Sequence, residues 1–425
     1  MRLITLATMF IAFFKLTIVY ANESHDIYIP ASQNSFSNVA RHTITSRFLY
    51  GSQVVDVSLP VNYHETGYQI KYPLVVVLDG ELLFHSVSGF VQFQAMNSQM
   101  PEAIVVGIQN LPETRRDMTP RPLNKKGEPL WFGGKEDLYL SFIRNELMPF
   151  LDEQYRIADF KVLIGLSPSA SLTLHSFWKQ PSLFSGYIVI NQADFSAVAY
   201  GGETIFDKVI NSVKQQEKGN RFLYISMPKG GAARNPKILQ DYKRLEKELS
   251  PFIANKLSFK WELIDKQSYA AVLPAVMSGF ELIFPAHLWD VNYHDFVSQE
   301  VGMTLNNIRA HFSELSDEYS FMALPKGERY YNRNRLKRIV YILIQQKRYS
   351  EAESILNYWL SIYPYSSNVH DTFADLYHVQ GNTNLELKHR INALDLAKKH
   401  NDYRATLFEE ALENLRSTLS KAPQQ

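Results

Sequence analysis

Apolar residues in the first two thirds of the chain form short runs that predict buried strands. Residues 72–80 (YPLVVVLDG) and 102–108 (EAIVVGI) are nearly continuous apolar segments, which is typical of strands covered on both faces of a sheet. Residues 51–60 alternate apolar and polar side chains instead, and this pattern predicts a half-buried strand. Further strand-like runs lie at 161–165, 186–191, 221–226 and 259–264.

Segments with apolar residues at helical spacing lie between and after these runs. They cover residues 135–155, 169–178, 237–252 and 271–284. Strands that alternate with helices predict an α/β fold with a doubly wound, mostly parallel sheet. Because ligands bind such sheets at the carboxyl ends of the strands, the residues that follow each strand are the first candidates for a functional site.

After about residue 290 the strand pattern ends and the chain predicts a small all-α tail. Residues 335–364 carry apolar and aromatic positions at the spacing of a tetratricopeptide helix pair. Residues 373–396 form a weaker, degenerate copy, and a helix over 403–419 would cap it. Two repeats rarely stand alone, so we expect the tail to pack on the first domain or on a partner protein. A purely structural helical extension is the alternative.

The N-terminus predicts a secretory signal peptide. Met1-Arg2 supplies a basic start, an apolar run follows, and a small residue stands at Ala21. Lys15 interrupts the apolar run, which argues against a permanent membrane span. A loose N-terminal core helix is the alternative. The predicted organisation is a signal peptide over 1–21, an α/β domain over 22–290, a helical connector over 291–330 and tetratricopeptide-like repeats over 331–420.

Charge and composition exclude several function classes. The 425 residues include 44 basic and 43 acidic side chains, and this balance argues against nucleic-acid binding, which needs a basic face. The chain has no cysteine, so it has neither disulfides nor thiolate metal sites. No histidine–carboxylate spacing predicts a metal, and the Lys229-Gly230-Gly231 segment lacks the full phosphate-loop pattern. We therefore expect no cofactor, and we expect an exported, periplasmic or secreted bacterial protein.

Candidate chemistry centres on Ser167. The segment VLIGLSPSASLTLH (162–175) joins a strand-like run to a helix-like run through Gly-x-Ser-x-Ser. In serine hydrolases, a strand–Gly-x-Ser-x-Gly–helix turn holds the nucleophilic serine above a parallel sheet.

The first half of the chain resembles the esterase D–like branch of the α/β-hydrolases, which includes ferric-enterobactin esterase. The likeness covers roughly residues 45–285. It rests on several blocks in the family's order, which are YPLVVVLDGE (72–81), AIVVGIQN (103–110), RRDMTP (115–120), GGKEDLYLSFIRNELMPFLDEQYR (133–156) and IGLSPSA (164–170).

This resemblance implies a role for particular residues. Ser167 would be the nucleophile, and a histidine on the loop after the last strand would be its base. A carboxylate after the preceding strand would orient that base. Backbone N–H groups after the serine and around Asp79, Gly80 and Glu81 would hold the oxyanion. Arg116 and Asp117 are candidates for the substrate cleft. Together with Arg115 they could contact an anionic substrate, and the alternative is a structural ion pair that holds the loop.

Several positions depart from the family pattern. Pro168 follows the serine and has no N–H, so it cannot donate to an oxyanion. Tyr269 stands where the family has its histidine, and a tyrosine is a poor base at neutral pH. The loop over 227–236 contains no acidic residue, and Asp265 could only orient a base that is missing. Four other histidines are present that could replace the missing base, and none of them is expected to do so: His85, His175, His287 and His294.

Three functions follow from these observations. The first is an exported hydrolase-fold protein, a pseudoenzyme, that binds a small ester or acyl ligand in the inherited cleft, or a protein through its tail. The second is an active serine carboxylesterase that uses Ser167 on small acyl or siderophore-type esters. The third is a scaffold that acts through its helical repeats.

Overall fold

The computed structural model describes most of the chain after residue 38. The described residues are 39–49, 51–110, 112–121, 126, 128–191, 198–200, 203–216, 221–234, 236–253, 255–327 and 335–421. The predicted signal peptide, residues 1–21, lies outside these ranges. The statements below concern the unit formed by residues 38–425.

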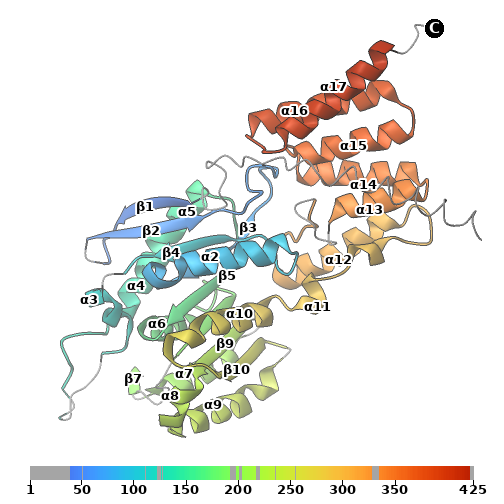
Figure 1. The fold of residues 1–425 in the computed structure, drawn as a ribbon. Coiled ribbons are helices and arrows are strands. Elements are labelled where there is room, and N and C mark those ends of the chain that lie inside the picture. Colours follow the sequence, from blue (N-terminus) through green and yellow to red (C-terminus); the bar gives the residue numbers. More distant parts are fainter. Residues whose placement is uncertain are drawn as a thin grey trace, which may run out of the picture. The chain divides into compact units, whose positions relative to one another are not determined.

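An eight-stranded sheet forms the centre of the α/β part (Figure 1). Its order is β1-β2-β4-β3-β5-β6-β9-β10, and the pairs β1–β2 and β2–β4 are antiparallel. All other neighbours are parallel, which confirms the predicted doubly wound, mostly parallel sheet. The strands are β1 (Val39–Thr45), β2 (Ser52–Ser58), β3 (Tyr72–Val77), β4 (Ile104–Ile108), β5 (Ile157–Leu166), β6 (Gly186–Ile190), β9 (Arg221–Pro228) and β10 (Leu257–Ile264). A separate hairpin pairs β7 (Val198–Tyr200) with β8 (Glu203–Thr204).

Helices cover both faces of the sheet. One face packs on α2 (Gly80–Met96), α10 (Val272–Ile283) and α12 (Thr304–Tyr319). The other packs on α4 (Glu136–Phe142), α5 (Met148–Gln154), α6 (Pro168–Lys179), α7 (Ile205–Gln215) and α9 (Pro236–Leu249). The continuous apolar runs of β3 and β4 are buried along their whole length, because both of their faces are covered. The short helices are α3 (Pro112–Arg115), α8 (Lys229–Arg234) and α11 (Ala286–Trp289).

Three sequence-based expectations need correction. The strand at 51–60 is not half-buried: it lies inside the sheet, and its polar Asp56 is buried in a 2.7 Å ion pair with Arg41 of the edge strand. The single helix predicted over 135–155 contains a π-helical turn at Ile143–Leu147, just before Pro149, whose missing N–H cannot complete the regular helical bonding. The predicted loop over 227–236 begins with the end of β9 and continues as α8.

The C-terminal part is helical and packs on the α/β part. Its helices are α13 (Leu336–Gln345), α14 (Tyr349–Ile362), α15 (Ser367–Val379), α16 (Thr383–Lys399) and α17 (Ala405–Lys421). One buried apolar cluster runs from α2 and α10 through α12 into α13, α14 and α15. Lys326 also forms a 3.1 Å ion pair with Glu102, and Gly67 N–H donates to the Ile362 carbonyl at 3.2 Å. The helical tail therefore buries apolar side chains against the α/β part, which is one of the two packings expected from the sequence.

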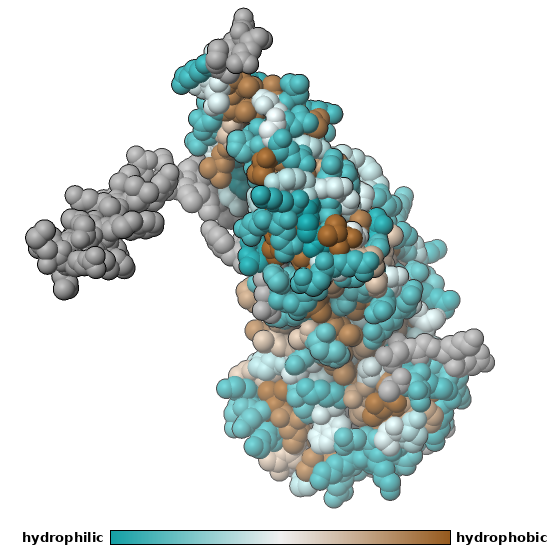
Figure 2. All heavy atoms as spheres, turned by 90° about the vertical axis from the view of Figure 1, so that its right-hand side faces the viewer, coloured by the Kyte–Doolittle hydropathy of each residue, from teal (hydrophilic) through white to brown (hydrophobic). Residues whose placement is uncertain are grey.

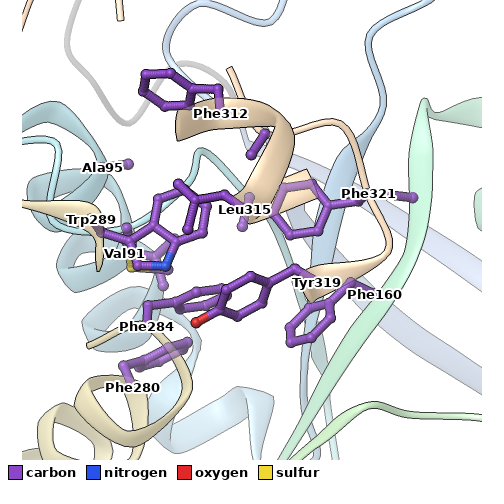
Figure 3. Packing of buried hydrophobic residues seen from close by; sticks show 14 of the residues in the cluster. Val91, Ala95, Phe160, Phe280, Phe284, Trp289, Phe312, Leu315, Tyr319 and Phe321 are labelled. Carbon is purple, nitrogen blue, oxygen red and sulfur yellow. The ribbon is translucent and has the colours of Figure 1, made fainter. Parts of the chain in front are cut away.

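Aromatic side chains fill the junction between these parts. Figure 3 shows Phe284, Trp289, Tyr319 and Phe160 converging. Phe284 directly follows α10, and the other three come from α11, α12 and β5. The Phe284 and Tyr319 rings stack with centroids 5.5 Å apart, and the Tyr319 hydroxyl donates to the Ile283 carbonyl at 2.7 Å. Such aromatic pairs contribute an attraction beyond the burial of their large surfaces. They therefore stabilise the packing of α12 against the sheet.

The visible surface carries no continuous apolar band. On the face in Figure 2, apolar side chains lie in small patches among hydrophilic ones. Within the described residues, no helix is both long and apolar enough to cross a membrane.

Candidate active site

Ser167 stands on a tight turn between β5 and α6. Its backbone has φ 59° and ψ −107°, and holding a non-glycine residue in such a conformation costs of order 1–3 kcal/mol. The Ser167 N–H donates to the Ile190 carbonyl at 2.8 Å, which ties the turn to the neighbouring strand β6. The residue is exposed at the end of the buried strand. This is the geometry that a nucleophile elbow requires.

Gly165 allows α6 to approach β5 closely enough to form this turn. A Cβ atom at Gly165 would overlap with Thr173 Oγ1 and with the Ser169 carbonyl oxygen. We therefore expect Gly165→Ala to lower the free energy of unfolding by about 1–3 kcal/mol, measured by denaturant titration. Gly89→Ala on α2 is the matched control, because its Cβ would meet nothing within 4 Å. That variant should be stabilised by about 0.5–1 kcal/mol. Equal midpoints for both variants would contradict this account.

Pro168 begins α6 directly after the serine. Proline suits the first position of a helix, where its missing N–H would have no helical partner. In a hydrolase elbow, however, this position supplies one of the two N–H donors to the oxyanion. The structure therefore combines an intact elbow backbone with an oxyanion site that lacks one donor.

A cavity of about 260 Å³ opens beside Ser167. Four of its lining residues are the last residues of neighbouring strands, so the cavity lies at the carboxyl ends of β5, β6, β9 and β10, as expected for this fold. Those residues are Leu166, Ile190, Pro228 and Ile264. The described lining contains neither an imidazole nor a carboxylate. Its polar groups are the side chains of Ser167, Asn191, Ser226, Ser268 and Tyr269.

Three of these cavity residues have positive backbone φ angles. Ser167, Asn191 and Ser268 have φ values of 59°, 61° and 47°. Each costs conformational energy in a non-glycine residue, and such residues cluster at functional sites. The cavity therefore combines a strained backbone with a described lining that contains no imidazole or carboxylate.

Ser226 lies deepest among the cavity's polar residues. It is fully buried, and its hydroxyl takes part in the hydrogen bonding around the Tyr224 side chain. The neighbouring Tyr224 directs its own hydroxyl to Glu262. Burial raises the pKa of Tyr224, and this hydrogen bond to a carboxylate raises it further, so Tyr224 stays neutral. A polar group of a ligand in this cavity would have the Ser226 hydroxyl as a hydrogen-bonding neighbour.

Asp79 supports the elbow through buried contacts and is not among the residues that line the cavity. Its carboxylate is fully buried, forms an ion pair with Arg115 at 2.6 Å, and accepts the Leu166 N–H at 3.0 Å and the Ser169 hydroxyl. Arg115 also donates to the Leu166 carbonyl at 3.2 Å. Burial raises the pKa of the Asp79 carboxyl, and Arg115 and the Ser169 hydroxyl oppose this shift. Ser169, which replaces the last elbow glycine, thus bonds the start of α6 to the end of β3.

Gly80 and Glu81 form the first turn of α2 beside Asp79. A Cβ at Gly80 would lie 2.7 Å from the Ile108 carbonyl oxygen, so the close approach of α2 to β4 requires glycine. Glu81 accepts the Asn110 N–H at 3.0 Å and lies 3.7 Å from Arg115. Neither residue is among those that line the Ser167 cavity.

Arg116 and Asp117 lie near the elbow's support but make contacts within their own loop. Arg116 lies over the Phe132 ring at 5.4 Å, and Asp117 pairs with Lys135 at 2.8 Å. Neither lines the described cavity. The neighbouring Arg115 makes the contact with the elbow, and its ion pair with Asp79 is the structural kind of contact that the sequence analysis gave as the alternative for this stretch.

Tyr269 is the one sequence-predicted partner that shares the cavity with Ser167. Its side chain is 70% exposed at the cavity edge. None of the four alternative histidines lines the cavity. His175 is buried against Asp137 at 2.8 Å, and His85, His287 and His294 are exposed.

The acidic and basic residues that flank the cavity pair with each other. Lys229 and Asp265 follow the ends of β9 and β10, and their side chains lie 3.7 Å apart in solvent. Neither is among the lining residues, so neither replaces the missing base or acid in this geometry.

Part of the α/β region matches a family model. Residues 47–235 match the family model Esterase, described as "Putative esterase". The uncharacterised protein YbbA of Bacillus subtilis (strain 168) is 30% identical over 140 residues, which are 32% of this chain and 54% of YbbA. The chain thus spans about half the length of this curated relative.

Solved structures share the fold. The chain is similar to an IroE-like serine hydrolase from Shewanella oneidensis, with a TM-score of 0.57 and 19% identity over 75% of this chain and 98% of that one. An uncharacterised protein from Capnocytophaga ochracea DSM 7271 has a TM-score of 0.53 and 16% identity over 89% of this chain and 99% of that one. These similarities confirm the fold predicted from the sequence, and the match over residues 47–235 agrees with the esterase-like family that the sequence resembles.

Proposed function

We propose that this esterase-like chain binds an uncharged small ligand in the Ser167 cavity and does not hydrolyse it. The observation that carries the proposal is the cavity itself: strained, hydroxyl-rich and next to an exposed serine, with no base or acid among its described lining residues. Without a base, the serine hydroxyl stays a weak nucleophile and a good hydrogen-bonding group.

The lining defines the ligand's chemistry. Leu166, Ile190 and Val272 provide an apolar wall, and Ser226 and Ser268 provide hydrogen-bonding groups. A charged ligand would lose its hydration and gain no ion pair from the described lining, so an ester or amide fits better than a carboxylate. A cavity of about 260 Å³ suits a small acyl compound.

The second candidate is an active serine esterase for small acyl or siderophore-type esters. Its supporting observation is the elbow, since Ser167 keeps the strained and exposed backbone of a nucleophile. In this alternative a base outside the described cavity lining would have to reach Ser167.

Two further parts of the proposal concern location and partners. The basic and apolar N-terminal segment supports export to the periplasm or beyond, with no permanent membrane span. The helical tail supports binding of a partner protein, because repeat helices expose extended surfaces for this purpose.

Binding of phenyl butyrate, a neutral ester, tests the proposed function. We expect saturable binding by calorimetry, weaker binding of the 4-phenylbutyrate anion, and recovery of the intact ester by chromatography. Tyr269→Ala should weaken ester binding by about 2- to 10-fold, because it removes an exposed aromatic contact of about 0.5–1.5 kcal/mol. Tyr403→Ala is the matched control, since Tyr403 is 57% exposed elsewhere. Labelling by a fluorophosphonate that disappears in Ser167→Ala would instead establish the esterase.

A further inference from the structure

A second cavity lies in the groove between α2 and α10. Its volume is about 560 Å³, and it shares no lining residue with the Ser167 cavity. The two helices cover the same face of the sheet (Figure 1), and they touch through Phe90 and Phe280, whose ring centroids are 5.7 Å apart. This groove has no part in the function proposed above.

The wall of the groove is mainly apolar. Phe280 and Phe284 stack with centroids 6.5 Å apart and continue inward as the aromatic cluster of Figure 3. Met100 and Met277 add flexible side chains, and Met277 is 52% exposed. A volume of this size with a mostly apolar lining and a few polar groups is typical of a site for a small molecule.

The described polar groups of the groove are neutral apart from one carboxylate. Gln94, Gln99 and Ser278 are neutral, and Glu281 is the one charged residue in the described lining. Glu281 is exposed, and among the described residues no ion pair or hydrogen bond of its carboxylate is found. A cation near Glu281 would gain a charge partner and could also lie against aromatic rings, whereas an anion would be repelled.

We infer that this groove binds an amphiphile with one apolar chain and a cationic head group. The chain would lie against Phe90, Phe280 and Met277, and the head group would lie beside Glu281. Covering Phe90 and Met277, which are partly exposed, removes apolar surface from water and supplies the main part of the affinity, whereas Phe280 is already buried and forms the floor of the groove. The single carboxylate then selects the charge of the head group.

Three octyl compounds with different head groups test this inference. Octyltrimethylammonium, octyl glucoside and octyl sulfate are titrated into the full-length protein by calorimetry, each below its critical micelle concentration. We expect the affinity to fall in the order cationic, neutral, anionic. Glu281→Gln should bring the cationic affinity down to about the neutral one, a change of about two- to fivefold for an exposed ion pair.

A second test of the inference places a positive charge inside the groove. Met277→Lys should weaken binding of the ammonium compound by about tenfold and improve binding of the sulfate. Leu407→Lys on α17 is the matched control, because Leu407 is 60% exposed and lies outside the groove; it should leave all three affinities unchanged. Equal binding of the three head groups, absence of saturable binding, or insensitivity to Met277→Lys would overturn the inference. Phenyl butyrate binding to these variants should remain normal, which separates a failure here from a failure of the Ser167 proposal.

Discussion

Purified wild-type protein is expected to cleave 4-nitrophenyl butyrate at least about 10⁴-fold more slowly than a serine esterase with a complete triad. Loss of a triad member typically costs on the order of 10⁴–10⁶ in kcat, and the activity that survives depends largely on the oxyanion hole. Here Pro168 also removes one oxyanion donor, which typically costs roughly 2.7–4 kcal/mol of transition-state stabilisation. The measurement is the initial rate after subtracting the Ser167→Ala background.

Pro168→Gly serves as the informative companion variant. It restores an N–H after the serine but supplies no base, so its turnover should remain within about 10²–10³ of the wild-type rate. Ordinary enzymatic rates in the wild-type protein that vanish in Ser167→Ala would contradict the binding function and support the esterase.

Asp79→Ala is expected to lower the free energy of unfolding by about 3 kcal/mol. The substitution leaves the Arg115 guanidinium without its buried partner. It also removes one acceptor from the Leu166 N–H and from the Ser169 hydroxyl, which keep only the hydrogen bonds between Leu166 and Ser169. Breaking one side of a buried ion pair is costly for this reason, even where the intact pair adds little net stability. Denaturant titration followed by circular dichroism measures the effect, and phenyl butyrate binding should weaken with it because the elbow loses its support.

Glu81→Gln is the matched control for Asp79→Ala. Glu81 also lies near Arg115, but at 3.7 Å and with a side chain that is 25% exposed. We expect less than about 1 kcal/mol of destabilisation from its neutralisation. If the two variants unfold at the same midpoint, Asp79 does not have the supporting role assigned to it here.

Much of the fold was predictable from local patterns. Continuous valine and isoleucine runs marked β3, β4 and β6 because strands covered on both faces need no polar positions. The patterns missed β1, whose alternating VARHTIT sequence is an edge strand of modest hydrophobicity. They also missed α2, where a glycine and several serines and glutamines weaken the helical signal although its inner side chains are buried.

The candidate site was predictable only in part. The Gly-x-Ser turn marked Ser167, and the order of blocks placed Tyr269 on the loop that borders the same cavity. The contributions of Ser226 and Asn191 were missed, because single polar residues at strand ends carry no motif. Arg115 and Arg116 could not be told apart in the sequence, since adjacent arginines look alike and only the course of the loop decides which one reaches Asp79.

The sequence by itself determined the alternation of strands and helices, the elbow and the absence of an N–H at Pro168, because these follow from residue type and near neighbours. The tertiary structure alone decided that Asp79 supports the elbow, that three strained residues meet at one cavity, and that the helical tail shares a core with the sheet. Those features depend on residues far apart in the chain, and no local pattern of side chains specifies which of them meet.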